Sequence, residues 1–265
     1  MLSAAVLWHI AVFRLAARVR LVKPNFNGLP IMSSYGIVLS VYIAAGSSAL
    51  AVLGYADWRS AGLYAAVTGA MALLGAIDDV FGSREVGGFR GHFRKLLRER
   101  KLTTGALKAV GGGVVGAAAG WVAGEGSAVE WVLAALLIPA AANSLNVLDL
   151  RPGRALAVFF AGLGVTWVLA SGGLRAPWIV GWTAISAAGF APLDCRARAM
   201  MGDSGANALG AVLGLTIALS TGAATQIGAI ALFAGVQIYS EIRSVSALIE
   251  RNAVLREIDR RLGVR

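Results

Sequence analysis

The chain has 265 residues, of which 57% are hydrophobic and only 14% are charged, and its formal net charge is +10. Soluble domains are about a quarter charged, so this chain lacks the polar surface to face water on all sides. The composition excludes a disordered chain, a collagen-like chain and a disulfide scaffold, and it indicates an integral membrane protein.

Nine apolar windows are long enough to cross a bilayer as helices. In chain order they are residues 2–19, 31–54, 60–77, 104–123, 129–148, 155–171, 176–193, 205–221 and 223–239. We therefore expect an all-α, polytopic bundle of about nine transmembrane helices, in which residues 1–240 form a single domain. Very few residues separate the last two windows, which predicts a tight helical hairpin.

Positive charges indicate the orientation of the bundle. Four of them lie late in the first window or just after it: Arg14, Arg18, Arg20 and Lys23. This order favours an uncleaved helix with its N-terminus outside. Only Arg59 and Arg175 then lie on the outer side, and 22 of the 24 lysines and arginines lie at or near the cytoplasmic side. Orientation in the cell membrane thus accounts for the net charge, and no nucleic acid partner is expected.

The fourth window carries a glycine at every fourth position: Gly112, Gly116, Gly120 and Gly124. This spacing puts small residues on one helix face and lets a neighbouring helix approach closely. We expect a packing role for these glycines.

Three aspartates close apolar windows at the cytoplasmic edge of the membrane. Acids within a membrane or at its edge are costly and usually functional. Asp78 and Asp79 end the third window, and Asp149 ends the fifth in the pattern Asn143-x-x-Asn146-x-x-Asp149. A helix C-terminus already carries partial negative charge and disfavours acids. Solvation of helix ends and hydrogen bonding between helices are the alternatives, but convergence on one membrane face favours a functional site.

A fourth aspartate opens the eighth window in Gly202-Asp203-Ser204-Gly205. Asp203 or Ser204 is a good N-cap, which is the purely structural interpretation. A glycine-flanked helix N-terminus also offers backbone N–H groups to a phosphate. Because several carboxylates would repel a phosphate, we expect a divalent cation with oxygen ligands, Mg²⁺ or alternatively Mn²⁺, to which Asn146 could add an amide oxygen.

The cytoplasmic segment of residues 88–101 combines Phe and Leu with many cations, which predicts an amphipathic helix at the membrane interface. It either rests on anionic headgroups or contacts a lipid phosphate or nucleotide diphosphate through Arg90 or Arg94. His92 fits a hydrogen-bonding role better than a catalytic one, and Lys108 can reach back to the same face. Residues 241–265 predict a cytoplasmic amphipathic helix, with partner binding as the alternative.

Taken in order, these motifs resemble those of the polyprenyl-phosphate N-acetylhexosamine-1-phosphate transferases. That family includes phospho-N-acetylmuramoyl-pentapeptide transferase and the UDP-GlcNAc:undecaprenyl-phosphate GlcNAc-1-phosphate transferases. The resemblance covers nearly the whole chain. It implies Mg²⁺-dependent transfer of a sugar-1-phosphate from a UDP-sugar to undecaprenyl phosphate or a similar polyprenyl phosphate. UMP would be released at the cytoplasmic face, and the product would begin a lipid-linked cell-envelope glycan.

The resemblance also implies roles for individual residues. Asp203 would bind the metal, with Asn146 as a second ligand. Asp78 and Asp79 would activate the acceptor phosphate or position the metal, and Asp149 would complete the catalytic set near the nucleotide. Direct attack by the acceptor phosphate and an aspartyl intermediate both stay open. The substrate-binding residues would be Asn143, Lys108, Arg151, Arg90, His92, Arg94 and Ser204.

The chain departs from the family after Asp149. Many members read Asp-Gly-Leu-Asp-Gly there, whereas this chain reads Asp149-Leu-Arg151-Pro-Gly. The histidine-rich loop and tenth span of many members also have no counterpart after the ninth window, so the identity of the sugar is left open. Arg151 and Arg154 are expected to replace part of the lost diphosphate contacts.

Two other functions compete with this interpretation. Transporters also carry acids and broken helices, although they place them near the bilayer midplane, whereas the acids here gather at one face. A catalytically silent protein that binds polyprenyl phosphate is the second alternative, but all four aspartates are present. Membrane lipids are expected around the bundle, and a homodimer is left open.

Overall fold

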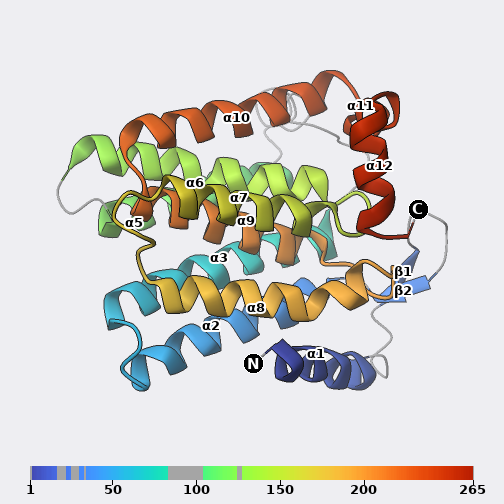
Figure 1. Cartoon of the computed structure of the whole chain (residues 1–265), viewed down its shortest axis with the longest axis horizontal. Coiled ribbons are helices and arrows are strands. Elements are labelled where there is room, and N and C mark those ends of the chain that lie inside the picture. The colour runs from blue at the N-terminus through green and yellow to red at the C-terminus, as the bar shows by residue number, and fades with distance from the viewer. Residues whose placement is uncertain are drawn as a thin grey trace.

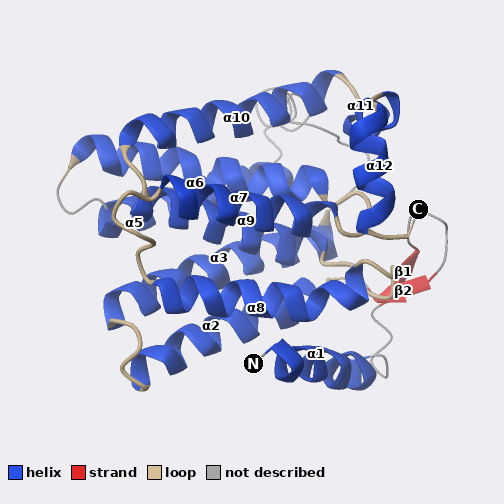
Figure 2. Cartoon of the chain, viewed as in Figure 1, coloured by secondary structure: helices blue, strands red, loops and turns tan. Residues whose placement is uncertain are grey.

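The computed structural model describes residues 2–16, 22–24, 30–32, 34–82, 104–123 and 127–264. This part of the chain is almost entirely helical, as predicted (Figures 1 and 2). The exception is an unexpected antiparallel ribbon, in which β1 (Val22–Pro24) pairs with β2 (Pro30–Met32). Because this ribbon takes up residues 30–32, the helix expected from residue 31 begins at Gly36.

Each of the nine apolar windows overlaps one helix, with bounds that differ by a few residues. In chain order the helices are α1 (Leu2–Ala16), α2 (Gly36–Val52), α3 (Trp58–Phe81), α5 (Thr104–Ala123), α6 (Ala128–Leu148), α7 (Arg154–Leu169), α8 (Pro177–Asp194), α9 (Gly202–Ser220) and α10 (Ala223–Ile242). Within the described ranges, α3, α5, α6 and α10 are long and apolar enough to cross a membrane. The prediction of a helical, membrane-embedded protein is confirmed at this level.

Helix α9 is the central helix of the bundle. It packs against α6 and α3 most extensively and also against α2 and α7, and every residue from 204 to 217 is buried. Glycines allow α6 to approach α9 closely, because a side chain at Gly210 or Gly214 would collide with the backbone of α6. A helix that is apolar on all sides is stable in a protein core or in a membrane, and α9 is enclosed by protein.

Helices α1, α2 and α8 form a layer on one side of α9 (Figure 1). Tyr35 stacks on Phe190 of α8 with ring centroids 5.2 Å apart, and its hydroxyl donates to the carbonyl oxygen of His9 at 2.8 Å. The backbone N–H groups of Tyr35 and Gly36 donate to carbonyl oxygens of Met200 and Met201. These bonds fasten the start of α2 to the segment that leads into α9.

The prediction of a tight helical hairpin formed by the last two windows is wrong. The connection is short, since α9 ends at Ser220 and α10 begins at Ala223, but α10 packs mainly on α6 and touches α9 little. The faces of α9 are already covered, whereas α6 offers polar partners. Gln237 of α10 donates to the carbonyl oxygen of Ala140 at 2.9 Å, and Ser144 donates to that of Phe233 at 3.1 Å.

The close approach expected at the glycines of α5 is confirmed at two of them. A side chain at Gly116 would collide with the carbonyl oxygen of Ala135, and one at Gly120 with that of Trp131. Gly112 has room for ordinary contact, and Gly124 lies outside the described residues.

Replacing Gly116 by valine should therefore weaken the packing of α5 on α6. Overpacking of this kind costs about 1–3 kcal/mol, so the Gly116→Val variant should melt earlier in detergent than the wild type. Gly113→Val is the matched control, because this glycine lies on the same helix with open space around it. Equal melting temperatures for the two variants would contradict the packing role.

The tail contains two helices where one was expected. They are α11 (Val245–Arg251) and α12 (Ala253–Leu262), separated by Asn252. The side-chain oxygen of Asn252 accepts hydrogen bonds from the backbone N–H groups of Val254 and Leu255 at 3.0 Å each. This N-cap starts a new helix and so interrupts the expected one.

A buried ion pair fastens α12 to α7. Arg154 donates from Nε and Nη2 to the two carboxylate oxygens of Asp259 at 2.6 and 3.0 Å, and from Nη1 to the Ser246 hydroxyl at 2.8 Å. Both members of the ion pair are less than a tenth exposed. The guanidinium of Arg154 is therefore engaged by the tail, and its expected contact with a diphosphate stays a prediction.

Removing one member of this pair should be more damaging than removing both. Asp259→Asn leaves the Arg154 charge buried without its counter-ion, which costs about 3 kcal/mol. Arg154→Met combined with Asp259→Leu removes both charges and should recover most of that loss. Thermal melting of the purified variants checks this order, with the exposed Glu257→Gln on the same helix as a control. A double variant less stable than Asp259→Asn would refute the ion pair as the cause.

Candidate functional site

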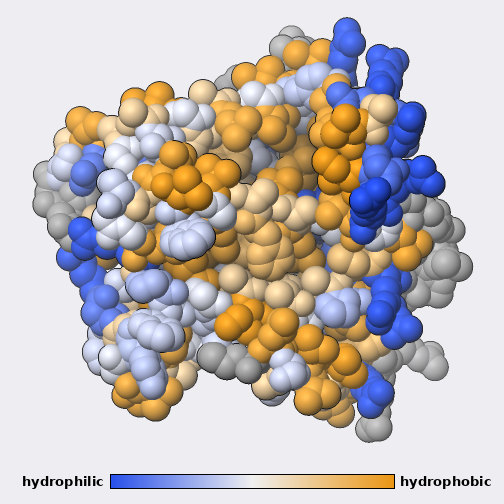
Figure 3. All heavy atoms as spheres, viewed as in Figure 1, coloured by the Kyte–Doolittle hydropathy of each residue, from blue (hydrophilic) through white to orange (hydrophobic). Residues whose placement is uncertain are grey.

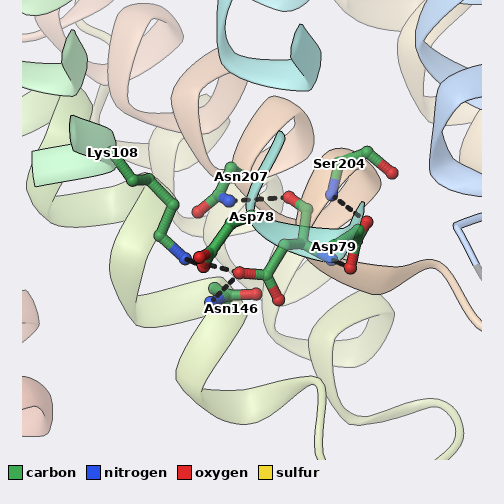
Figure 4. A network of polar contacts seen from close by, with 7 residues as sticks. Asp78, Asp79, Lys108, Asn146, Ser204 and Asn207 are labelled. Atoms are coloured by element: carbon green, nitrogen blue, oxygen red, sulfur yellow. Dashed lines mark hydrogen bonds and ion pairs between the residues drawn. The ribbon is translucent and has the colours of Figure 1, made fainter. Parts of the chain in front are cut away.

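One end of the bundle gathers polar side chains from four helices (Figure 4). The last turn of α3 supplies Asp78 and Asp79, the first turns of α5 supply Lys108, and the last turn of α6 supplies Asn146. Asp203 lies in the first turn of α9. The structure thus brings together residues that lie far apart in the sequence.

Lys108 lies between two of the aspartates. Its ammonium nitrogen is 2.5 Å from Oδ2 of Asp203 and 3.2 Å from Oδ2 of Asp78. The side chains of Lys108, Asp203 and Asp78 are 14%, 28% and 20% exposed. Water therefore screens their charges only partly. Lys108 thus attracts both carboxylates and offsets part of the repulsion between them.

Asp79 caps the N-terminus of α9 from a neighbouring helix. Its two carboxylate oxygens accept hydrogen bonds from the backbone N–H groups of Asp203 and Ser204, at 3.2 Å each. The residue before the helix, Met201, makes no side-chain cap. A carboxylate at this position is favoured by the helix dipole. The backbone N–H groups of Asp203 and Ser204, at the helix N-terminus that was expected to bind a phosphate, thus donate to Asp79 instead.

The polar face of α6 contacts two different helices. Asn146 donates to Oδ2 of Asp203 at 3.3 Å and so belongs to the acid cluster. Asn143 instead donates to Oε1 of Gln237 on α10 at 3.1 Å. Asn207, one turn along α9, donates to the carbonyl oxygen of Asp203 at 2.6 Å and stabilises the first turn of that helix.

Asp149 extends the acid cluster at the C-terminus of α6, where it is the C-cap residue. Burial and the negative charges of Asp194 and Asp203 raise the pKa of its carboxyl well above its usual range. The backbone of Gly202 acts in the opposite direction by hydrogen bonding. These neighbours put Asp149 beside the start of α9, together with the other three predicted aspartates.

The remaining predicted residues lie elsewhere or outside the described ranges. Arg151 is half-buried in the turn between α6 and α7. The hydroxyl of Ser204 is buried, and no described residue forms a hydrogen bond with it, whereas its backbone N–H donates to Asp79. The predicted residues of the segment 88–101 lie outside the described residues: Arg90, His92 and Arg94.

A cavity of about 480 Å³ opens beside the acid cluster, between α5, α6 and α10. Its polar lining residues are Asp78, Lys108, Asn143, Asn207, Gln237, Ser240 and Glu241. The rest of its lining is apolar or small and includes Leu136 and Pro139 of α6 together with small residues of α5. The cavity thus has a largely apolar lining that includes one cation, Lys108, and two acids, Asp78 and Glu241.

The donor groups of the site fit Mg²⁺ when phosphate completes the coordination. Among the described residues, no three His, Cys, Asp or Glu side chains gather closely enough to hold a metal. Magnesium does not need such a group, because it is usually bound by one or two carboxylates, several waters and substrate phosphates. The Asp203 carboxylate and the Asn146 side chain, joined by a 3.3 Å hydrogen bond, supply one carboxylate and one amide.

Two residues of this region were not predicted. Asp194, the last residue of α8, is buried and accepts a hydrogen bond from the backbone N–H of Gly153 at 2.7 Å. It is an acid at a helix C-terminus, so the rule that singled out Asp78 would have found it. Gln237 lines the cavity, and an amide within an apolar window was its signal.

No protein-family model matches the chain, and no curated protein sequence matches it. The assignment of the site therefore rests on its geometry.

Replacing Lys108 by methionine should destabilise this end of the bundle. The carboxylates of Asp78 and Asp203 would lose their shared counter-ion, and we expect a loss of about 2 kcal/mol, since partial exposure reduces the cost of a buried unpaired charge. Lys108→Arg keeps the charge and should stay closer to the wild type. Thermal melting in detergent compares the two. If both variants melted together with the wild type, the ion pairs would not stabilise the fold.

Proposed function

We propose that the protein transfers a sugar-1-phosphate, from the resemblance an N-acetylhexosamine-1-phosphate, from a UDP-sugar to a polyprenyl phosphate. The observation that carries this proposal is the position of Lys108. It joins Asp78 and Asp203, and with Asp78 it lines a cavity that combines polar residues with a largely apolar lining. A polyprenyl phosphate has the same two parts, and the ordered motifs of the sequence point to the same reaction.

The proposal includes an orientation. All nine helices from α1 to α10 would cross the cell membrane, with the N-terminus outside and with α11 and α12 in the cytoplasm. Figure 3 supports this arrangement, since hydrophobic residues cover the middle of the face and hydrophilic residues gather at its two edges, most densely along the edge that carries α12. Residues 1–240 would be the catalytic domain.

Different residues of the site have different roles in the proposed transfer. Lys108 binds phosphate oxygens at the cavity edge and leaves its carboxylate partners as charge accumulates on the substrates. Asp79 holds the start of α9 and so positions Asp203. When bound at Asp203 and Asn146, Mg²⁺ supplies charge neutralisation on the diphosphate oxygens.

The overall exchange of bonds is balanced. The bond between the sugar-bearing phosphorus of the donor and the bridging oxygen breaks, and UMP leaves with that oxygen and the electron pair of the bond. A new P–O bond joins the sugar phosphate to the acceptor phosphate. Asp78 faces the cavity and so has the position needed either to orient the acceptor or to form an aspartyl intermediate. The acids lie at one end of α3, α6 and α9, which disfavours a transporter with a midplane site.

The test is an assay of the purified protein with Mg²⁺, undecaprenyl phosphate and a panel of nucleotide sugars. Release of UMP together with a lipid-linked sugar is the expected result. Asp78→Asn and Asp203→Asn should lower the rate at least 100-fold, because each removes a charge at the reacting phosphates. Asp79→Asn should lower it through misplacement of Asp203. Glu250→Gln, on the exposed surface of α11, is the control.

Two outcomes would overturn the proposal. Undiminished product in all three aspartate variants would show that the acid cluster is not the site. A wild type that binds undecaprenyl phosphate but releases no UMP from any nucleotide sugar would favour the silent lipid-binding protein.

A further inference from the structure

A second pocket lies at the opposite end of the bundle. It has a volume of about 370 Å³, and its polar lining comes mainly from Asp57, Arg59, Glu130 and Arg175. Arg59 and Asp78 are in the first and last turns of the same helix, α3, which separates them by about 28 Å at 1.5 Å per residue. The pocket is therefore a different site from the acid cluster.

The two arginines of this pocket are held by different parts of the fold. Nη2 of Arg59 donates to the carbonyl oxygen of Val122 at 2.5 Å, which joins the start of α3 to the end of α5. The backbone N–H of Arg175 donates to the Ser220 hydroxyl at 3.0 Å, which joins the α7–α8 turn to the end of α9. The two arginines thus line one pocket from separate parts of the fold.

The concentration of positive charge on the cytoplasmic side does not explain the presence of Arg59 and Arg175. They are the two cations placed outside by the proposed topology, whereas cations are otherwise concentrated on the cytoplasmic side. Their meeting at a single pocket indicates a binding role.

Two carboxylates share the pocket with the arginines. Asp57 caps α3, since its Oδ1 accepts the backbone N–H of Ser60 at 2.7 Å, and Glu130 lies in the first turn of α6. With two charges of each sign, the pocket does not favour a simple anion. It complements a ligand that carries a phosphate and an ammonium group together.

Exposed aromatic side chains surround the same end of the bundle. They are Tyr55, Trp58, Trp121, Trp131 and Trp178. Some of them contact each other, with ring centroids 5.4 Å apart for Tyr55 and Trp178 and 6.3 Å apart for Trp121 and Trp131. Such aromatic belts lie at the level of the lipid headgroups. The pocket therefore opens at the depth where headgroups are found.

We propose that this pocket binds the headgroup of an outer-leaflet phospholipid that carries both a phosphate and a primary ammonium, as in phosphatidylethanolamine. Arg59 and Arg175 bind the phosphate oxygens, and Glu130 and Asp57 accept from the ammonium. A trimethylammonium has no N–H to donate, and a glycerol headgroup has no positive charge. The leaflet rests on the proposed orientation, but the site does not depend on the proposed transferase reaction.

Native mass spectrometry of the purified protein tests the proposal. After incubation with equimolar phosphatidylethanolamine, phosphatidylglycerol and phosphatidylcholine, the first lipid should be retained at least fivefold over each of the others. Arg175→Gln, which keeps the backbone bond to Ser220, should lower its retention about fivefold. Glu130→Gln should remove the preference over phosphatidylglycerol. Arg251→Gln, exposed at the other end of the molecule, should change nothing.

Soluble competitors separate a lipid headgroup from a free phosphate. Phosphoethanolamine should displace the bound lipid, and inorganic phosphate at the same concentration should not. Displacement by both alike, or equal retention of the three lipids by the wild type, would overturn the proposal. This comparison uses the wild type only, so it decides the question even if Arg175→Gln fails to fold, which size exclusion and melting would show.

Discussion

The hydrogen bonds from the start of α9 to Asp79 are the contact on which the rest of the site depends. Because α9 is enclosed by its neighbours, its first N–H groups need a partner from the protein, and α3 supplies it. Gly75, one turn before Asp79, makes the approach possible, since any side chain there would collide with the backbone of Asp203. The depth of α9 in the bundle is thereby fixed, and with it the place where Lys108 meets Asp203.

This contact also explains why acids stand at a helix end that disfavours them. The C-terminus of α3 opposes negative charge, but Asp79 lies against the N-terminus of α9 and Asp78 lies against Lys108. Each carboxylate is thus unfavourable for its own helix and favourable for a neighbour. The electrostatic cost is local, whereas its compensation comes from residues that are distant in the sequence.

The sequence alone predicted the helices and the members of the acid cluster well, because a polar residue stands out in an apolar chain. Asp78, Asp203 and Asn146 were found in this way, and the structure brings them together. The sequence did not predict which helices pack side by side. Hydropathy indicates which end of a helix a residue occupies but not which helix lies beside it, so the packing of α10 on α6 and the inward hydroxyl of Ser204 were not foreseen.

Helix α10 is the least embedded wall of the cavity. Its buried residues are Gln226 and Phe233, and both α10 and α5 pack on α6 while making little contact with each other in the described parts of the chain. In the proposed orientation, the cavity would therefore open sideways toward the hydrocarbon layer. A long-chain lipid would reach Lys108 by sliding in from within the bilayer, so its chain would never pass through water, while a water-soluble donor would approach from the helix ends.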